Sequence, residues 1–163
     1  MLGLDNSTIP LSFVAGPAVL ANVCAILQNG VNIRHNHSVD QWRRFQVWLA
    51  SDDGEFGRFY ADPATAVRLS ARRVHLQLCT LELLLLGTWV FGLTCFLALA
   101  WALAANAHLT LAGSLSMLVL GSGAVGLALM GAAAFTAASE NRCAQRLMLL
   151  RPGYHPTRAG EKS

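Results

Sequence analysis

The stretch TLELLLLGTWVFGLTCFLALAWALA, residues 80–104, decides the fold class of this chain. It is almost entirely apolar, and Glu82 is its one charged side chain. Runs of about 17 to 25 apolar residues are what a helix needs to cross a hydrocarbon layer of about 30 Å. The stretch therefore predicts a membrane-spanning helix with a carboxylate close to one end.

The composition extends this prediction to the whole sequence. Only 13% of the 163 residues are charged and 54% are hydrophobic, whereas about 25% of a typical soluble domain is charged. A soluble core does not account for the difference, because a small domain is mostly surface. Residues 11–27 and 109–138 form two further apolar runs without a charged side chain. We therefore predict an all-α integral membrane protein with three transmembrane helices.

The first apolar run is also compatible with a signal peptide, which needs a positively charged segment before it. The preceding residues, MLGLDNSTIP, contain Asp5 as their one charged side chain. The following residues, QNGVNIRHN, are polar and unlike a cleavage site. We expect this run to be retained as a span.

The basic residues predict an orientation, because Lys and Arg are retained on the cytoplasmic side of membrane spans. Seven of the twelve lie between the first and second apolar runs, and five follow the third. We expect the N-terminus outside and the C-terminus in the cytoplasm, in a multi-pass protein of the cell inner membrane. The net charge of +3 then reflects this retention and an attraction to anionic headgroups. It does not indicate a nucleic-acid partner.

We expect one membrane domain over residues 1–163. Its segments are span one at 11–31, a cytoplasmic helical segment at 32–78, span two at 79–104, span three at 109–138 and a cytoplasmic tail at 139–163. Asp62 and Pro63 are the residue types of an N-cap and a first helical position, so a helix should begin there and continue into span two. Ser38 and Gln41 have capping-box spacing. The short amphipathic helix after them either lies in the headgroup layer or extends span one.

Aromatic and basic residues of the cytoplasmic segment are suited to contact with headgroups or with a protein partner. The candidates are Trp42, Arg43, Arg44, Arg72 and Arg73. His35 and His37 with Asp40 resemble a metal cluster only superficially, because zinc needs three or four ligands in a defined geometry. We expect no metal site, and the role of the two histidines stays open.

Span three is rich in small residues, whereas span two is rich in Leu and carries four aromatic side chains. Small residues let helix backbones approach closely in lipid, where packing joins helices. We therefore expect span three to be the buried span and span two to be the more lipid-exposed one. The candidate helix-packing interface comprises Gly121, Ser122, Gly123, Gly126, Ala128 and Gly131.

Two polar residues, Asn22 and Glu82, are expected inside the membrane. Asn22 should face another helix, because a lipid-facing amide is costly. Glu82 lies about one helical turn into the hydrocarbon layer, on one helical stripe with His75. We expect Glu82 to pair with His75 or with Arg34 at the end of span one. A ligand- or ion-linked role is the alternative for an intramembrane acid.

The sequence lacks the motifs of common enzyme classes. It has no P-loop, no H-E-x-x-H helix and no G-x-S-x-G elbow, and the hydrocarbon part of its spans has no histidine for haem ligation. GSGAVG at residues 121–126 lies in an apolar run without a preceding strand, so we interpret it as packing glycine rather than a dinucleotide motif. The four cysteines lack paired spacing and predict neither a disulfide nor a zinc site. We expect no catalytic residues and no cofactor.

The helix order resembles that of a family of small uncharacterised bacterial inner-membrane proteins, which have one span, a long cytoplasmic helical hairpin and a closing pair of spans. The residues that carry the resemblance are PAVLANVCAILQNGVNIR, AVRLSARRVHLQLCTLELLLLG and a third span that ends in ENRCAQRL. The resemblance implies this architecture and this location, and it implies no activity.

We therefore expect a non-catalytic membrane interaction protein, either an accessory or assembly subunit of a larger membrane complex or a homo-oligomer packed through span three. Its partners would be the lipid bilayer and other membrane subunits or further copies of itself. The alternative is an oligomeric channel or small transporter that uses Glu82 and Asn22, with Gln28 and Asn29 as further polar candidates. An enzyme is not expected.

Overall fold

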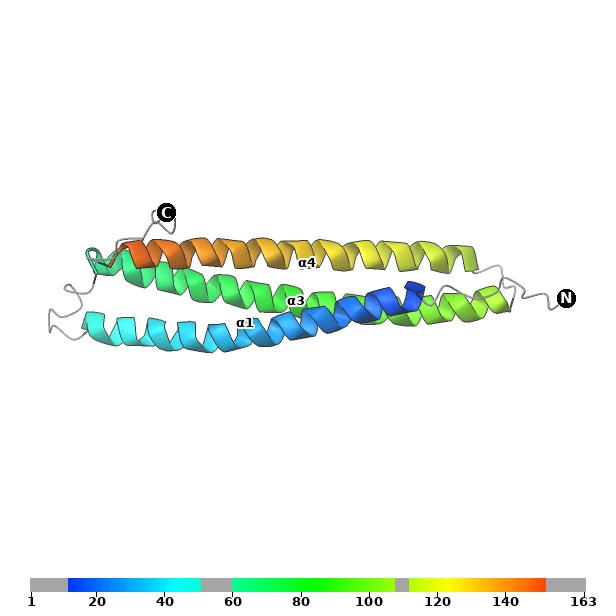
Figure 1. Cartoon of the computed structure of the whole chain (residues 1–163), viewed down its shortest axis with the longest axis horizontal. Coiled ribbons are helices and arrows are strands. Elements are labelled where there is room, and N and C mark those ends of the chain that lie inside the picture. The colour runs from blue at the N-terminus through cyan, green and yellow to red at the C-terminus, as the bar shows by residue number, and fades with distance from the viewer. Residues whose placement is uncertain (1–11, 51–59, 108–111, 152–163) are drawn as a thin grey trace, which may run out of the picture. The chain divides into compact units, whose positions relative to one another are not determined.

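The computed structural model describes residues 12–50, 60–107 and 112–151, and its described secondary structure is helical (Figure 1). The helices are α1 at Ser12–Ala50, α3 at Pro63–Asn106 and α4 at Ala112–Leu149. At a rise of about 1.5 Å per residue, each is roughly 57 to 66 Å long, about twice the hydrocarbon thickness. The all-α prediction is confirmed. The expected N-terminal cap, the turn after Ala50, the outer turn at His108 and the tail beyond Arg151 lie outside the described residues.

α1 continues without a break through the amphipathic segment, which therefore extends the first helix. The capping box expected at Ser38 and Gln41 is wrong, because Ser38 lies in the middle of α1 and is buried. The physical reason is the lack of a stop signal. Pro17 is the one proline within this helix, and a single glycine such as Gly30 lowers helix stability without ending a helix.

α3 begins where the sequence predicts. The backbone N–H of Thr65 donates to Asp62 Oδ1 at 3.1 Å, and the N–H of Ala66 donates to the carbonyl oxygen of Asp62 at 3.1 Å. Asp62 is therefore the N-cap and Pro63 the first helical residue, where a missing N–H costs no hydrogen bond. From there the helix runs unbroken to Asn106, as predicted.

Burial repeats at every seventh residue along each helix. The buried series are Cys24, Val31, Ser38 and Phe45 on α1; Ser70, Gln77, Leu84, Phe91 and Ala98 on α3; and Val119, Gly126, Ala133, Glu140 and Leu147 on α4. A helix returns to nearly the same face after seven residues, and this is the period of coiled-coil packing. We call each series the seam of its helix.

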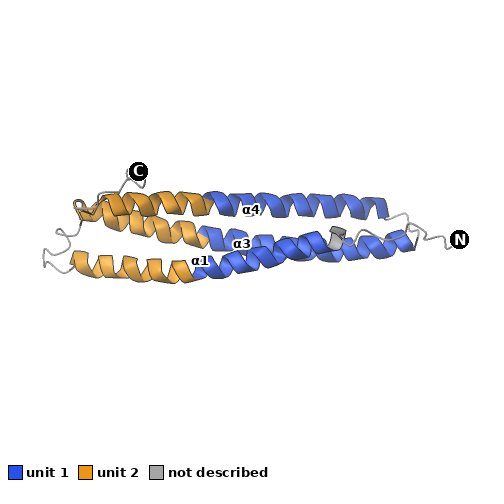
Figure 2. Ribbon diagram, in the orientation of Figure 1, with its two compact units in different colours: residues 1–32, 79–135 blue, residues 33–78, 136–163 orange. Residues whose placement is uncertain are grey.

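The chain divides into two units, and each helix contributes to both (Figure 2). Unit 1 comprises residues 1–32 and 79–135, and unit 2 comprises residues 33–78 and 136–163. The divisions lie close to the segment boundaries expected from the sequence at 31/32, 78/79 and 138/139. They reflect packing alone and do not by themselves locate a membrane.

The core of unit 1 is apolar and receives side chains from all three helices. Its buried residues are Cys24, Val31, Leu84, Phe91 and Ala133. The Phe91 ring, which is 1% exposed, lies against Gly126, where a Cβ atom would come within 2.7 Å of the ring. Only glycine allows this close approach of α3 and α4. Beside it, the Thr94 hydroxyl donates to Ser122 Oγ at 2.9 Å.

The core of unit 2 differs in polarity. Its apolar cluster comprises Phe45, Tyr60, Ala66 and Leu147. Other buried positions in this unit carry polar side chains, namely Ser38, Ser70, Gln77 and Glu140. Buried polar groups require hydrogen-bond partners. The interior of unit 2 therefore depends on hydrogen bonds as well as on apolar contacts.

Within the described residues, α3 and α4 are long and apolar enough to cross a membrane. α1 does not meet the same measure there, because amide side chains at Asn22, Gln28 and Asn29 interrupt its apolar part. The share of buried residues in the most apolar stretch is 28% in α3 and 17% in α4. The expectation that span three is the more buried one is therefore wrong for the single chain, because its small residues occupy two opposite faces and one of these faces is exposed.

Replacing Asp62 with Ala should lower the melting temperature of the chain in mild detergent, because Thr65 loses its acceptor. The hydrogen bonds donated by the Thr65 side chain and backbone hold the pKa of Asp62 below its ordinary value. The stabilisation is therefore present above the unfolded-chain pKa of about 3.9 and is lost as the pH falls through the lowered pKa. The two melting temperatures should differ at neutral pH and converge in strong acid.

Asp62→Asn is the matched control for this experiment, because an Asn side chain also caps helices and does not titrate. It should retain most of the stability at neutral pH. A wild-type advantage over Asp62→Ala that stays the same in strong acid would contradict the contribution of the ionised cap.

Candidate functional site

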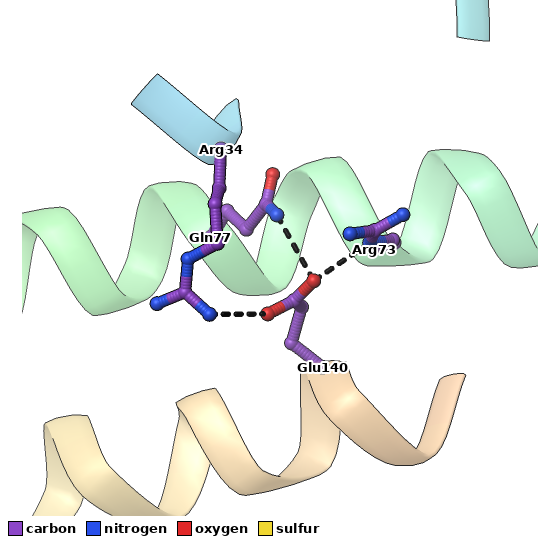
Figure 3. A network of polar contacts seen from close by, with 4 residues as sticks. All are labelled: Arg34, Arg73, Gln77 and Glu140. Carbon is purple, nitrogen blue, oxygen red and sulfur yellow. Dashed lines mark hydrogen bonds and ion pairs between the residues drawn. The ribbon is translucent and has the colours of Figure 1, made fainter. Parts of the chain in front are cut away.

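A buried carboxylate, Glu140, connects the three helices within unit 2 (Figure 3). Its side chain, on α4, is 2% exposed. Arg73 of α3 donates from Nε to Glu140 Oε1 at 2.6 Å, and Gln77 of α3 donates from Nε2 to the same oxygen at 3.0 Å. Arg34 of α1 places Nη1 3.8 Å from Glu140 Oε2. We call these four residues the Glu140 cluster.

Helical spacing explains how the Glu140 cluster assembles. Arg73 and Gln77 are four residues apart on α3 and therefore project from one face, which meets the seam of α4 at Glu140. The side chains of Arg73 and Arg34 are 24% and 48% exposed, so the carboxylate is the deeply buried partner. A carboxylate removed from water needs a paired charge and hydrogen bonds, and Arg73 supplies both.

The Glu140 cluster has the chemistry of an anchor rather than of a reaction centre. Both oxygens of Glu140 face cationic side chains, and arginine does not lose its proton in proteins. Removing one partner of such a pair leaves a buried charge uncompensated, which is strongly destabilising. The cluster therefore holds α1, α3 and α4 in alignment within unit 2.

Further polar atoms lie in the interior of unit 2. Four buried atoms have no hydrogen-bond partner among the described residues, namely His35 Nδ1, Ser38 Oγ, Trp42 Nε1 and Gln77 Oε1. The first three belong to one face of α1 by their spacing of three and four residues. Buried atoms of this kind are ordinarily bonded to ordered water. Unit 2 thus has a polar interior along α1, and His35 belongs to it.

Glu82 is exposed on α3, and its expected pairing with His75 stays a prediction. Arg34, one of its two expected partners, contacts Glu140 instead, because that carboxylate is buried and Glu82 is exposed. Glu82 lies in unit 1 beside a groove of about 410 Å³. The groove is lined by Gln28, Asn29, Asn32, Leu81, Glu82 and Leu85. Three expected polar candidates therefore meet there, whereas Asn22 is exposed elsewhere on α1.

The expected packing residues of α4 divide between two faces. Ser122 and Gly126 face the interior of unit 1, where they contact Thr94 and Phe91. Gly121, Ala128 and Gly131 are exposed, and Gly123 is half-buried. The small residues of α4 therefore contribute one set to packing within the chain and leave another on its surface.

The residues expected to contact headgroups or a partner also differ in their exposure. Arg43, Arg44 and Arg72 are exposed, as such contacts require, whereas Trp42 is half-buried with its indole nitrogen in the interior. Arg73 binds Glu140. His37 is exposed on α1 and lines a hollow of unit 2.

The sequence analysis missed Glu140, although a signal for it exists. In the sequence, Glu140 opens a charged segment after an apolar run and has the character of a surface residue. It lies at seven-residue intervals from Gly126, Ala133 and Leu147, which places it on the buried face of a continuous helix. The same spacing puts Gln77 in line with Leu84 and Phe91. Because these positions carry polar residues, the seven-residue repeat does not show in the sequence as a stripe of apolar residues.

Comparisons of the chain with protein-family models, curated proteins and solved structures find no match. The resemblance to a family of small bacterial membrane proteins therefore stays a prediction.

Replacing Glu140 with Gln should destabilise the chain by about 1.5 to 3 kcal/mol, the range for hydrogen bonds to charged groups. Gln keeps an acceptor for Gln77 but leaves Arg73 without a counter-charge. Denaturant unfolding in mild detergent measures the difference. Glu82→Gln is the matched control, and as an exposed substitution it should change stability by less than about 0.5 kcal/mol. Equal effects of the two variants would show that the Glu140 cluster does not anchor the helices.

Proposed function

We propose that this chain is a non-catalytic membrane interaction protein with three spanning helices, which joins other membrane subunits or further copies of itself through α4. The observation that carries the proposal is the exposed set of small residues on α4. A single chain leaves this set without a neighbouring helix at its glycines, and a second helix would bury it.

The outward stripe of α4 has the spacing of a helix-packing surface. It comprises Met117, Gly121, Ala124, Ala128, Gly131 and Phe135, all of them exposed. Successive members are alternately four and three residues apart, the a/d pattern of paired helices. A Cβ atom at Gly121 or Gly131 would meet no other atom within 4 Å. Small residues in this pattern allow a second backbone to approach closely in lipid.

The outward stripe lies opposite the seam of α4. Positions on a helix are separated by about 100° per residue, so Gly121 and Ala128 point away from Gly126 and Ala133. Large side chains at Met117 (73% exposed) and Phe135 (70% exposed) flank the small ones. A partner helix could thus pack on the small residues, with one large side chain at each end of the contact.

The proposed topology has the N-terminus outside, unit 1 in the inner membrane and unit 2 in the cytoplasm. All twelve Lys and Arg residues fall in unit 2, whereas unit 1 contains two charged side chains, Asp5 and Glu82. Basic residues stay on the cytoplasmic side, so this distribution supports the topology. It also supports residues 11–31 as a third span, because that part of α1 belongs to unit 1 and carries no charge.

Replacing Gly121 or Gly131 with Leu should weaken association of the chain with its partner or with itself by about 5- to 150-fold, because an overpacked contact costs about 1 to 3 kcal/mol. Extraction of the membrane in mild detergent, followed by size analysis and mass spectrometry of the co-purified species, measures the association. Ala134→Leu is the matched control, because Ala134 is exposed on α4 but lies outside the outward stripe.

Two results would contradict the proposed interface. One is a wild-type chain that extracts as a lone monomer, and the other is equal association by the Gly131→Leu and wild-type chains. A stoichiometric foreign partner would define an accessory subunit, and a pure assembly of this chain would define a homo-oligomer.

The second candidate function is an oligomeric channel or small transporter. The groove that brings Glu82 together with Gln28, Asn29 and Asn32 favours it. Carboxylate and amide oxygens suit hard cations, and acidic side chains within spans mark ion pathways. Under this alternative, several copies would turn their grooves toward a shared pore.

If the channel alternative holds, Glu82→Gln should abolish cation flux into liposomes reconstituted with the purified chain, because the pore loses its one carboxylate. Glu82→Asp, which keeps the charge, should retain part of the flux. The interaction proposal instead expects no flux from the wild type and unchanged association for Glu82→Gln. Flux that is equal in the wild type and Glu82→Gln would exclude the groove as the pathway.

A further inference from the structure

Unit 2 has a hollow of about 340 Å³ that takes no part in the proposed interface of α4 or in the groove at Glu82. Its lining residues are His37, Asp40, Gln41, Arg44, Phe45, Trp48, Tyr60 and Arg151. We call it the basic hollow. Its volume falls within the range of about 300 to 1,000 Å³ that is usual for small-molecule sites.

Three segments of the chain build the basic hollow. His37, Gln41, Arg44 and Trp48 are four, three and four residues apart on α1 and so share one face of it. The backbone N–H of Ala61 donates to the carbonyl oxygen of Leu150 at 3.0 Å. This bond ties the residues before α3 to the end of α4, and it brings Tyr60 and Arg151 to the same rim.

The apolar side of the basic hollow consists of aromatic rings. Phe45 and Tyr60 are buried and meet edge to face, with centroids 5.3 Å apart and an angle of 69° between the rings. Trp48 lies 6.1 Å from Phe45 and is partly exposed at the mouth. The packed rings of Phe45 and Tyr60 hold this side of the hollow in place, and the exposed Trp48 ring offers a surface on which a planar ligand can stack.

The polar side of the basic hollow carries an excess of positive charge. Arg44 and Arg151 line it with one carboxylate, Asp40, and neither arginine forms an ion pair within the described part of the chain. A second hollow of about 220 Å³ shares Gln41, Tyr60 and Arg151 with the first and reaches Arg73. Arg44 lines the hollow from α1, and Arg151 lines it from the segment after the end of α4. Two guanidinium groups on one hollow favour phosphate, which accepts bidentate hydrogen bonds and carries up to two charges.

We propose that the basic hollow binds a small soluble phosphate ester that carries a planar ring, of which a nucleoside monophosphate is the simplest example. Arg44 and Arg151 hold the phosphate, and Trp48 stacks on the ring. Gln41 and Asp40 accept hydrogen bonds from ring or sugar groups. The site lies in unit 2, so on the proposed topology it faces cytoplasmic metabolites. It does not depend on the association of α4.

Calorimetric titration of the full-length chain in neutral detergent with adenosine 5′-monophosphate tests the site. We expect saturable one-to-one binding that Arg44→Gln and Arg151→Gln each weaken by about 10- to 100-fold, as the loss of a charged hydrogen bond predicts. Arg43→Gln is the matched control, because Arg43 is an exposed neighbour that does not line the hollow, and its binding should change by less than about twofold. Circular dichroism melting verifies that each variant folds.

Two further arms identify the ligand chemistry. Inorganic phosphate should bind about 5- to 100-fold more weakly than the nucleotide, because it lacks the stacking ring, and Trp48→Ala should weaken the nucleotide alone. Vesicles with anionic phospholipid are the competing source of phosphate. The proposal is overturned if nucleotide binding does not saturate, or if Arg43→Gln weakens this binding as much as Arg44→Gln does. It is also overturned if the anionic vesicles bind the chain through Arg44 and the nucleotide does not.

Discussion

A buried carboxylate has to be neutralised where it lies, and within unit 2 this requirement aligns three helices at once. Arg73 and Gln77 bind one oxygen of Glu140, and Arg34 faces the other. A shift of any of these helices along its axis by one turn, about 5.4 Å, would separate the charges. The hydrophobic contacts of unit 2 are non-directional and tolerate such shifts, whereas the Glu140 cluster has one geometry. The alignment of the polar unit therefore depends on a single glutamate.

The seams of the three helices run through both units, and the interiors of the two units differ in polarity. In unit 1 they carry Cys24, Leu84 and Phe91, and cohesion comes from close packing such as that of Phe91 on Gly126. In lipid, where the hydrophobic effect does not join helices, this packing is the available force. In unit 2 the seams carry Gln77 and Glu140 beside the apolar Phe45 and Leu147, and charge and hydrogen bonding add to the apolar contacts. The change in character follows the proposed passage of each helix from bilayer to cytoplasm.

Much of the fold was accessible from the sequence because its signals are local. Asp62 and Pro63 start α3 by their own chemistry, and the apolar runs fix the long helices. The side-chain partners were not accessible, because they depend on which faces meet. Arg34, one of the two partners expected for Glu82 beside His75, lies at Glu140, since a buried acid competes more strongly for a cation than an exposed one. The sequence does not show which small residues of α4 pack inside the chain. Gly121 and Gly126 are the same residue type in the same apolar run, and they differ only because Phe91 of α3 lies against Gly126.

The position of Glu140 in the chain has a consequence for biosynthesis. Arg34 and Arg73 are synthesised before it, on the two earlier helices, and both are drawn to the one carboxylate of α4. Until residue 140 has been synthesised, the carboxylate that both arginines contact is missing. The alignment that the Glu140 cluster gives to the three helices of unit 2 therefore forms only after the last helix has been made. A chain that stops short of residue 140 would lack this alignment.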